Sequence, residues 1–204
     1  HIGCAGPDAP PWAVVPLPPP KPPRGEGAAL VINPIDRFVL AKLEANGLKP
    51  APRASDAVLN RRLHFAMTGL PPEPGKPLNT HRSTLNRLLA SPRYGEHWAR
   101  HWLDVARYAD SNGLDENVCH GNAWRYRDYV VRAFNRDTPY DRFLLEQLAG
   151  DLLEPSQDDQ REVDRLLATG MLTLAPKGLG EQDKELMAMD VVDDQIDVLG
   201  LSLI

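Results

Sequence analysis

The fold class is decided by residues 33–48, which read NPIDRFVLAKLEANGL. Asn33 can cap a helix, Pro34 suits the first helical position, and Asp36 favours the positive end of the helix. Apolar residues then recur at steps of three and four, and a glycine followed by a leucine forms a helix stop of the Schellman kind. The stretch therefore predicts a helix that begins after Asn33 and ends near Gly47.

The same pattern of cap, amphipathic run and stop recurs along the chain. A helix from Ser55 to Gly69 is expected to bury Leu59, Leu63 and Ala66. Further helices are predicted around residues 85–89, 92–109, 122–134, 138–150, 163–170 and from 181 onward. No alternating run is long enough for a sheet, apart from a short strand at residues 171–174. The prediction is a mostly α, irregular multi-helix domain.

Residues 1–33 differ from the rest in composition, because half of the 20 prolines lie within the first 34 residues. Such a segment lacks backbone donors and favours an extended polyproline conformation. We therefore expect a Pro-rich extended arm or linker, followed by a helical domain over residues 34–204. Two interpretations of the arm stay open: a flexible linker, or a segment that binds along a partner through Trp12, Val14 and Val15.

The other end of the chain is apolar, where polar residues are usual. Leu201, Leu203 and Ile204 are expected to need cover from more chain or from another subunit.

Bulk properties limit the classes of function. The net charge of −5 argues against a nucleic-acid binder, which would present a basic face. No run approaches the roughly 20 apolar residues that span a bilayer, so we expect no transmembrane segment in the chain itself. No glycine-rich phosphate loop and no Gly-x-Ser-x-Gly motif occurs. The two cysteines, Cys4 and Cys119, leave open whether they form a disulfide.

Two groups of residues near the middle of the chain could bind a metal. On the helix over residues 92–109, His97, His101 and Asp104 follow one another at steps of four and three. The alternative is that His101 bonds Asp104 or a backbone carbonyl. In the loop that follows, the oxygen donors of Asp110, Asn112 and Asp115 surround a glycine turn and could hold Ca²⁺. The alternative is a plain surface turn.

The last helix carries Asp190, Asp193, Asp194 and Asp197 on one stripe, where like charges repel. Interhelical Arg–Asp pairs, a bound divalent cation, a pair of carboxylates for hydrolysis and a solvated acidic face are the alternatives.

Cys119 and His120 match the end of the Cys-x-x-Cys-His haem-attachment motif. Position 116 is Glu116 where the first cysteine would stand, so covalent haem is excluded. Axial ligation of a neighbour's haem by His120 stays open.

Several of these segments form a series in a recognisable order. They are NPIDRFVL (33–40), TGLPP (68–72), LASPRYGE (89–96), RHWLDVARYADS (100–111), NAWRYRDY (122–129), EQLAGD (146–151) and the acidic stretch 189–197. Together they resemble the planctomycete cytochrome-c-associated domain family (PSCyt type), whose function is uncharacterised. In that family the position of His97 is usually basic, whereas His101 and Asp104 match the family pattern.

The resemblance implies a context for the chain. Members are exported, many are fused to or encoded with c-type cytochrome domains, and their chains usually continue past the end of this sequence, which makes the helical domain truncated relative to the family. We therefore expect a periplasmic or otherwise extracytoplasmic location. The expected partners are other protein subunits, such as a c-type cytochrome or a membrane-bound redox complex. No covalently bound cofactor is expected, and Ca²⁺ is the candidate ion.

Two functions follow as hypotheses. The first is a non-catalytic accessory or structural subunit of an extracytoplasmic assembly associated with c-type cytochromes or electron transfer. The alternative is a carboxylate- or Ca²⁺-dependent hydrolase module, acting on polysaccharide, that uses Asp104, Asp110 and the acids of the last helix.

Overall fold

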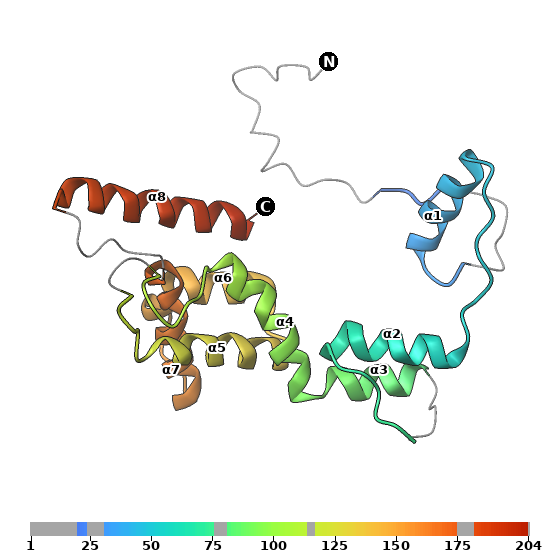
Figure 1. The fold of residues 1–204 in the computed structure, drawn as a ribbon, viewed down its shortest axis with the longest axis horizontal. Helices are drawn as coiled ribbons and strands as arrows, with labels where there is room; N and C mark the ends of the chain where they lie inside the picture. The colour runs from blue at the N-terminus through green and yellow to red at the C-terminus, as the bar shows by residue number, and fades with distance from the viewer. Residues whose placement is uncertain (1–19, 24–30, 76–80, 114–116, 175–181, 204) are drawn as a thin grey trace, which may run out of the picture. The chain divides into compact units, whose positions relative to one another are not determined.

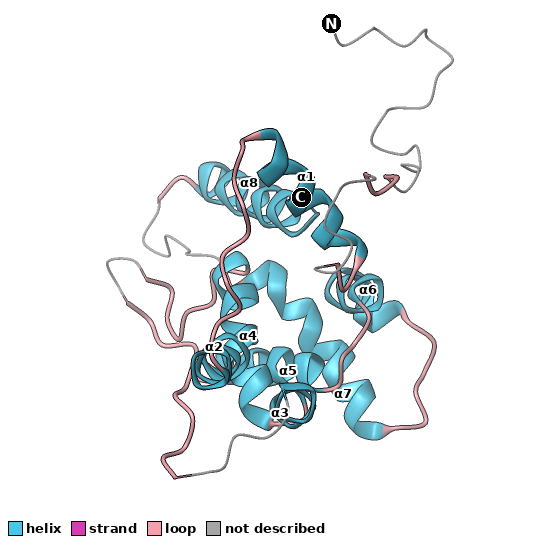
Figure 2. Ribbon diagram, turned by 90° about the vertical axis from the view of Figure 1, so that its right-hand side faces the viewer, coloured by secondary structure: helices cyan, strands magenta, loops and turns pink. Residues whose placement is uncertain are grey.

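The computed structural model describes residues 20–23, 31–75, 81–113, 117–174 and 182–203. The chain divides into two compact units, residues 1–53 and residues 54–204. The described residues form eight α-helices and short 3₁₀ helices; among them there is no β-strand, only an isolated bridge between Ser111 and Cys119 (Figures 1 and 2). The mostly α prediction is confirmed.

The first unit contains one helix, α1 (Pro34–Ala45). The Asn33 side chain caps its first turn, and the Asp36 carboxylate accepts from the Asn33 backbone N–H at 2.9 Å in return. Gly47 has a φ of 66°, and the N–H of Leu48 donates across the stop, as predicted. No residue of α1 is fully buried: Leu40 and Leu43 are half-buried, and Ile35, Phe38 and Val39 are exposed.

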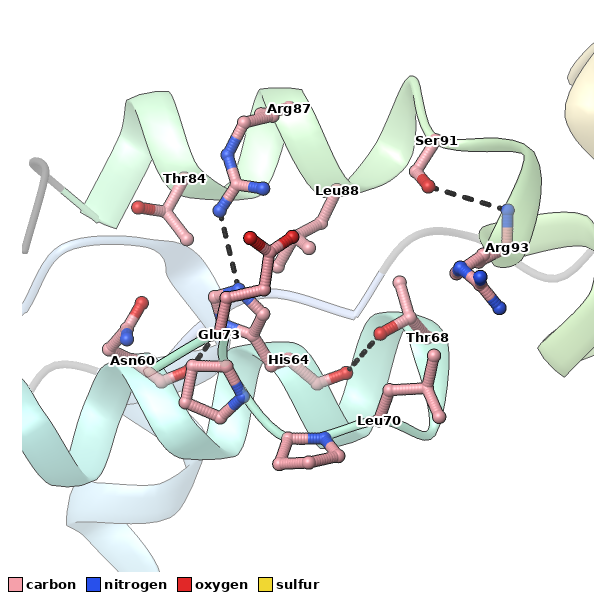
Figure 3. A pocket seen from close by; sticks show the side chains of 12 residues that line it. Asn60, His64, Thr68, Leu70, Glu73, Thr84, Arg87, Leu88, Ser91 and Arg93 are labelled. Carbon is pink, nitrogen blue, oxygen red and sulfur yellow. Dashed lines mark hydrogen bonds between the residues drawn. The ribbon is translucent and has the colours of Figure 1, made fainter. Parts of the chain in front are cut away.

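The second unit contains the remaining helices. They are α2 (Asp56–Thr68), α3 (His81–Leu89), α4 (Pro92–Val105), α5 (Ala123–Asn135), α6 (Tyr140–Ala149), α7 (Asp159–Ala168) and α8 (Lys184–Leu203), with the 3₁₀ helices η3 (Gly150–Leu152) and η4 (Thr169–Thr173). Helices α2 and α3 lie side by side and run in the same direction (Figures 1 and 3). Helix α5 packs on both α4 and α7, and α8 contacts α4.

An aromatic core joins α4, α5 and α6. The rings of Trp102 and Phe143 meet edge to face at a centroid distance of 4.7 Å, and Tyr129 stacks on Phe143 at 6.0 Å. Met171 of η4 and Val198 of α8 complete this buried cluster. The core therefore lies around α5.

Buried hydrogen bonds cross the same core. The Trp102 indole N–H donates to the Tyr126 hydroxyl at 3.0 Å, and that hydroxyl donates to Gln147 at 2.5 Å. The Tyr129 hydroxyl donates to Glu146 at 3.1 Å. Burial raises the pKa of both tyrosines, and the charge of Glu146 raises that of Tyr129 further.

The predicted buried face of α2 was wrong. Leu59 and Leu63 are only half-buried and Ala66 is exposed, whereas His64 and Thr68 are buried. The reason is tertiary: α3 packs on the polar face of α2, so the polar side chains of that face lie between the two helices.

The predicted strand at residues 171–174 was also wrong. Thr169–Thr173 is the 3₁₀ helix η4, which follows directly on α7 and inserts Met171, 2% exposed, into the core. The carbonyl of Leu172 accepts from the Gln195 side chain of α8 at 3.1 Å rather than from a neighbouring strand.

Helix α4 ends in an unusual way. Arg107 adopts a left-handed conformation with a φ of 52°, and the N–H of Tyr108 donates to the Leu103 carbonyl at 2.9 Å, which is the Schellman pattern. Glycine usually occupies this position, because other residues are strained there. The Arg107 guanidinium reaches α8, where it forms an ion pair with the Asp194 carboxylate and donates to the Asp194 carbonyl at 2.7 Å.

No helix in the described part of the chain is both long and apolar enough to cross a membrane.

Candidate functional site

A cavity of about 620 Å³ lies between α2, α3 and the segment Leu70–Glu73 that follows α2 (Figure 3). It lies entirely within the second unit. Its lining residues are Asn60, His64, Thr68, Leu70, Pro71, Pro72, Glu73, Thr84, Arg87, Leu88, Ser91 and Arg93. Cavities of this size hold small molecules in many proteins.

The buried centre of the cavity is a histidine that is bonded at both ring nitrogens. His64 Nδ1 lies 2.9 Å from the backbone oxygen of Asn60, and Nε2 lies 3.3 Å from Nη2 of Arg87 (Figure 3). A carbonyl oxygen can only accept and a guanidinium can only donate. The geometry therefore fits a neutral imidazole with the proton on Nδ1 and an accepting Nε2.

The floor and the rim of the cavity differ in exposure. His64, Thr68, Thr84 and Leu88 are buried, whereas Arg87, Arg93 and Glu73 are exposed at the rim. Leu70, Pro71 and Pro72 form an apolar wall. The site thus combines an apolar side with hydroxyl groups and with charged groups at its opening.

The histidine and aspartate candidates of α4 do not line this cavity. His101 and Asp104 are both exposed. The rings of His97 and His101 lie 6.0 Å apart, centroid to centroid. His97 packs against the end of α2, where a Cβ added to Gly69 would lie 2.6 Å from its Nδ1. Partial burial lowers the pKa of His97, and the charges of His101 and Arg100 lower it further.

The side-chain oxygens of Asp110 and Asn112, in the loop that follows α4, accept hydrogen bonds from groups within or next to this loop. Asn112 is 1% exposed, and its side-chain oxygen accepts from the N–H of Val118 at 2.8 Å. Asp110 accepts from the Tyr108 hydroxyl at 2.6 Å. Burial, followed by this hydrogen bond, raises the pKa of Tyr108 to about 12. Asp115 lies outside the described residues.

The four aspartates of α8 do not share one environment. Asp194 pairs with Arg107, whereas Asp190, Asp193 and Asp197 are exposed and have no ion-pair partner in the part of the chain that the structure describes. Within the described ranges, no three histidine, cysteine, aspartate or glutamate side chains gather as a metal site would require.

The candidate partner-binding residues are only partly described. Trp12, Val14, Val15 and Ile204 lie outside the described residues. Leu201 is 61% exposed and Leu203 is 65% exposed at the end of α8.

A second cavity, of about 680 Å³, lies between the start of α5 and the junction of α7 with η4. Cys119, an exposed free thiol, and His120 line it, and Nε2 of His120 is buried without a hydrogen-bond partner among the described residues. Two adjacent side chains supply an incomplete ligand set. Cys4 lies outside the described residues.

Sequence reasoning missed the pair of His64 and Arg87, because 23 residues separate them. One signal was present in the sequence. Asn60, His64 and Thr68 recur at steps of four and form a polar stripe on a helix whose buried face was predicted from its leucines.

A sequence model of PSCyt2, a family described as proteins of unknown function (DUF1549), matches residues 34–204. The chain belongs to the PSCyt2 family. The resemblance found in the sequence is thereby confirmed, and the PSCyt2 match begins at the first residue of α1 and extends across the division between the two compact units. No curated protein and no solved structure matches this PSCyt2 chain.

Proposed function

We propose that the chain is a non-catalytic accessory module of an extracytoplasmic assembly that contains a c-type cytochrome or another electron carrier, and that it docks there through α8. The observation that carries the proposal is an uncovered apolar stripe on this helix. Its members are Met189 (57% exposed), Val192 (44%), Ile196 (60%) and Leu203 (65%).

The spacing of these residues makes them one surface. Steps of three, four and seven residues bring all four side chains to the same side of a helix. The opposite side of α8 carries Val198, 1% exposed, which packs into the core of the second unit. The helix is therefore anchored on one side and apolar toward the solvent on another, as expected for a surface that binds a neighbour.

Helix α1 supports the same function. None of its residues is buried, and its apolar residues Ile35, Phe38 and Val39 are between 41% and 69% exposed. An isolated helix of this length is marginal in water, so its apolar face favours a role in packing against other protein.

The hydrolase alternative requires a pair of carboxylates that flank a cleft. Four cavities in the described part of the chain are lined neither by Asp104 and Asp110 nor by the aspartates of α8. The arrangement of the described residues thus favours docking over hydrolysis. The family's association with cytochrome c supports the choice of a redox partner.

The test is photo-crosslinking of the natural protein in its own cells. A photoreactive amino acid in place of Ile196 is expected to give an adduct that stains for haem and fractionates outside the cytoplasm. The matched control is the same amino acid in place of Val163, which is 50% exposed on α7 and outside the stripe. Equal adducts from both positions, or an adduct from position 196 whose partner carries neither haem nor another redox group, would contradict the proposal.

A further inference from the structure

The cavity between α2 and α3 contains a cation that is bonded to a neutral group. Nη2 of Arg87 donates to the imidazole of His64, and Arg87 forms no ion pair within the described part of the chain. A guanidinium has five N–H groups in a rigid fork, of which this contact uses one. His64 is itself held by the Asn60 carbonyl, so it fixes Arg87 at the opening with most of its donors still available.

A second polar group also lines the cavity. Thr84 is 2% exposed, and its side chain forms part of the cavity wall. A hydroxyl group can both donate and accept a hydrogen bond, so a bound molecule with a polar atom near Thr84 can bond to it.

Charged side chains of both signs surround the opening of the cavity. Arg93 lies at one end and is paired loosely with Glu96, at 3.9 Å with both side chains at least 60% exposed. Glu73 lines the same cavity (Figure 3). Arg87 is therefore the cation on which binding of an anion depends.

The apolar wall indicates the rest of the molecule. Leu70, Pro71, Pro72 and Leu88 offer apolar contact beside the charged opening. An inorganic ion would leave this surface unused, whereas an organic acid would cover it.

We propose that the cavity between α2 and α3 binds a small organic carboxylate, whose two oxygens accept from the guanidinium of Arg87 and whose organic part packs against Leu70 and Leu88. Guanidinium and carboxylate match as planar groups and form paired hydrogen bonds. His64 is a positioning residue that fixes the guanidinium, and Thr84 bonds a polar atom of the ligand. This site is separate from the α8 stripe and does not depend on the accessory function proposed above.

The test is a titration of the whole chain with benzoate, lactate and inorganic phosphate, followed by NMR shifts of the arginine side chains and by calorimetry. At least one of the two carboxylates is expected to bind saturably and more tightly than phosphate. Arg87→Gln is expected to weaken that binding roughly tenfold or more, because charge-assisted hydrogen bonds are lost. Arg82→Gln is the matched control, because Arg82 is exposed on the same helix and does not line the cavity.

Thr84→Val keeps the volume of the side chain and removes only the hydroxyl, so it tests the site in a protein that retains Arg87. It is expected to weaken binding by a smaller factor of a few fold. Absence of saturable carboxylate binding would overturn the proposal, as would tighter binding of phosphate or equal losses in the Arg87 and Arg82 variants.

Discussion

Helices α5 and α8 both carry apolar residues along their length, and they bury them to very different extents. Helix α5 has 13 residues and buries five of them, whereas α8 has 20 residues and buries Val198 and Ser202. The cause is position: α5 lies between α4 and α7, and α8 rests on the rest of its unit along one side. Apolar content alone therefore does not decide burial. The exposed apolar side chains of α8 are those that its proposed partner would cover.

The largest expected effect separates the core around α5 from the stripe on α8. Phe143→Ala removes a ring that contacts Trp102 and Tyr129, and we expect it to lower the free energy of unfolding by about 3–5 kcal/mol. Ile196→Ala should change it by less than about 0.5 kcal/mol, because that side chain is 60% exposed. Urea unfolding of both variants measures the difference. Similar losses would mean that α8 is covered as fully as the core.

A smaller effect is expected from the carboxylate that links α7 to α5. Asp164 is 2% exposed and accepts from Arg132 at 2.5 Å and from Arg136 at 2.8 Å. Asp164→Asn should cost about 1.5–3 kcal/mol, because two ion pairs are weakened while both arginines stay partly solvated. Thermal unfolding gives the value. Asp128→Asn is the control, since that carboxylate is paired only on the surface; an equal loss there would contradict the ranking.

The core should also weaken at high pH, through its tyrosines. Burial raises the pKa of Tyr126 in the folded state, so the unfolded chain releases its phenol proton first, near pH 10. Stability from this group is complete below pH 10 and falls as the pH rises above it, by about 1 kcal/mol by pH 11. Tyr126→Phe should flatten this dependence in urea unfolding at several pH values. An unchanged slope in the variant would assign the alkaline loss to other groups.

The smallest effects compare two neighbouring residues of α8. Asp193→Asn removes one of the repelling charges of an exposed stripe and should stabilise the chain by a few tenths of a kcal/mol. Asp194→Asn weakens the pair with Arg107 and should destabilise it by less than about 1 kcal/mol. High salt should shrink both effects, which differential scanning calorimetry can follow. A gain in stability from both substitutions would show that the pair of Arg107 and Asp194 does not hold α8.

Local signals allowed much of the fold to be predicted. The cap at Asn33 and the stop at Gly47 depend on residues within one or two turns, and the structure reproduces both. Ala66 was misplaced because the side of α2 that faces inward is chosen by α3, which is distant in sequence. Residues 171–174 were misread because a short apolar run suits a strand or a buried helical turn equally well.

The candidate site was harder to predict than the fold. His64 and Arg87 belong to different helices, and their contact depends on the two helices lying side by side in one direction. The spacing of the aspartates of α8 predicted one stripe, and the contact with Arg107 distinguishes Asp194 from the others. Charge patterns in a sequence identify such a stripe, and tertiary packing decides which of its members is paired.

The left-handed arginine at the end of α4 places two requirements on one residue. A glycine at this position would adopt the left-handed conformation without strain, but it would have no side chain to reach α8. Arg107→Gly would thus ease the turn while removing one of the contacts that hold α8. The same helix presents the stripe proposed to bind the partner. The backbone strain at position 107 is therefore coupled, through the Arg107 side chain, to the orientation of the proposed recognition surface.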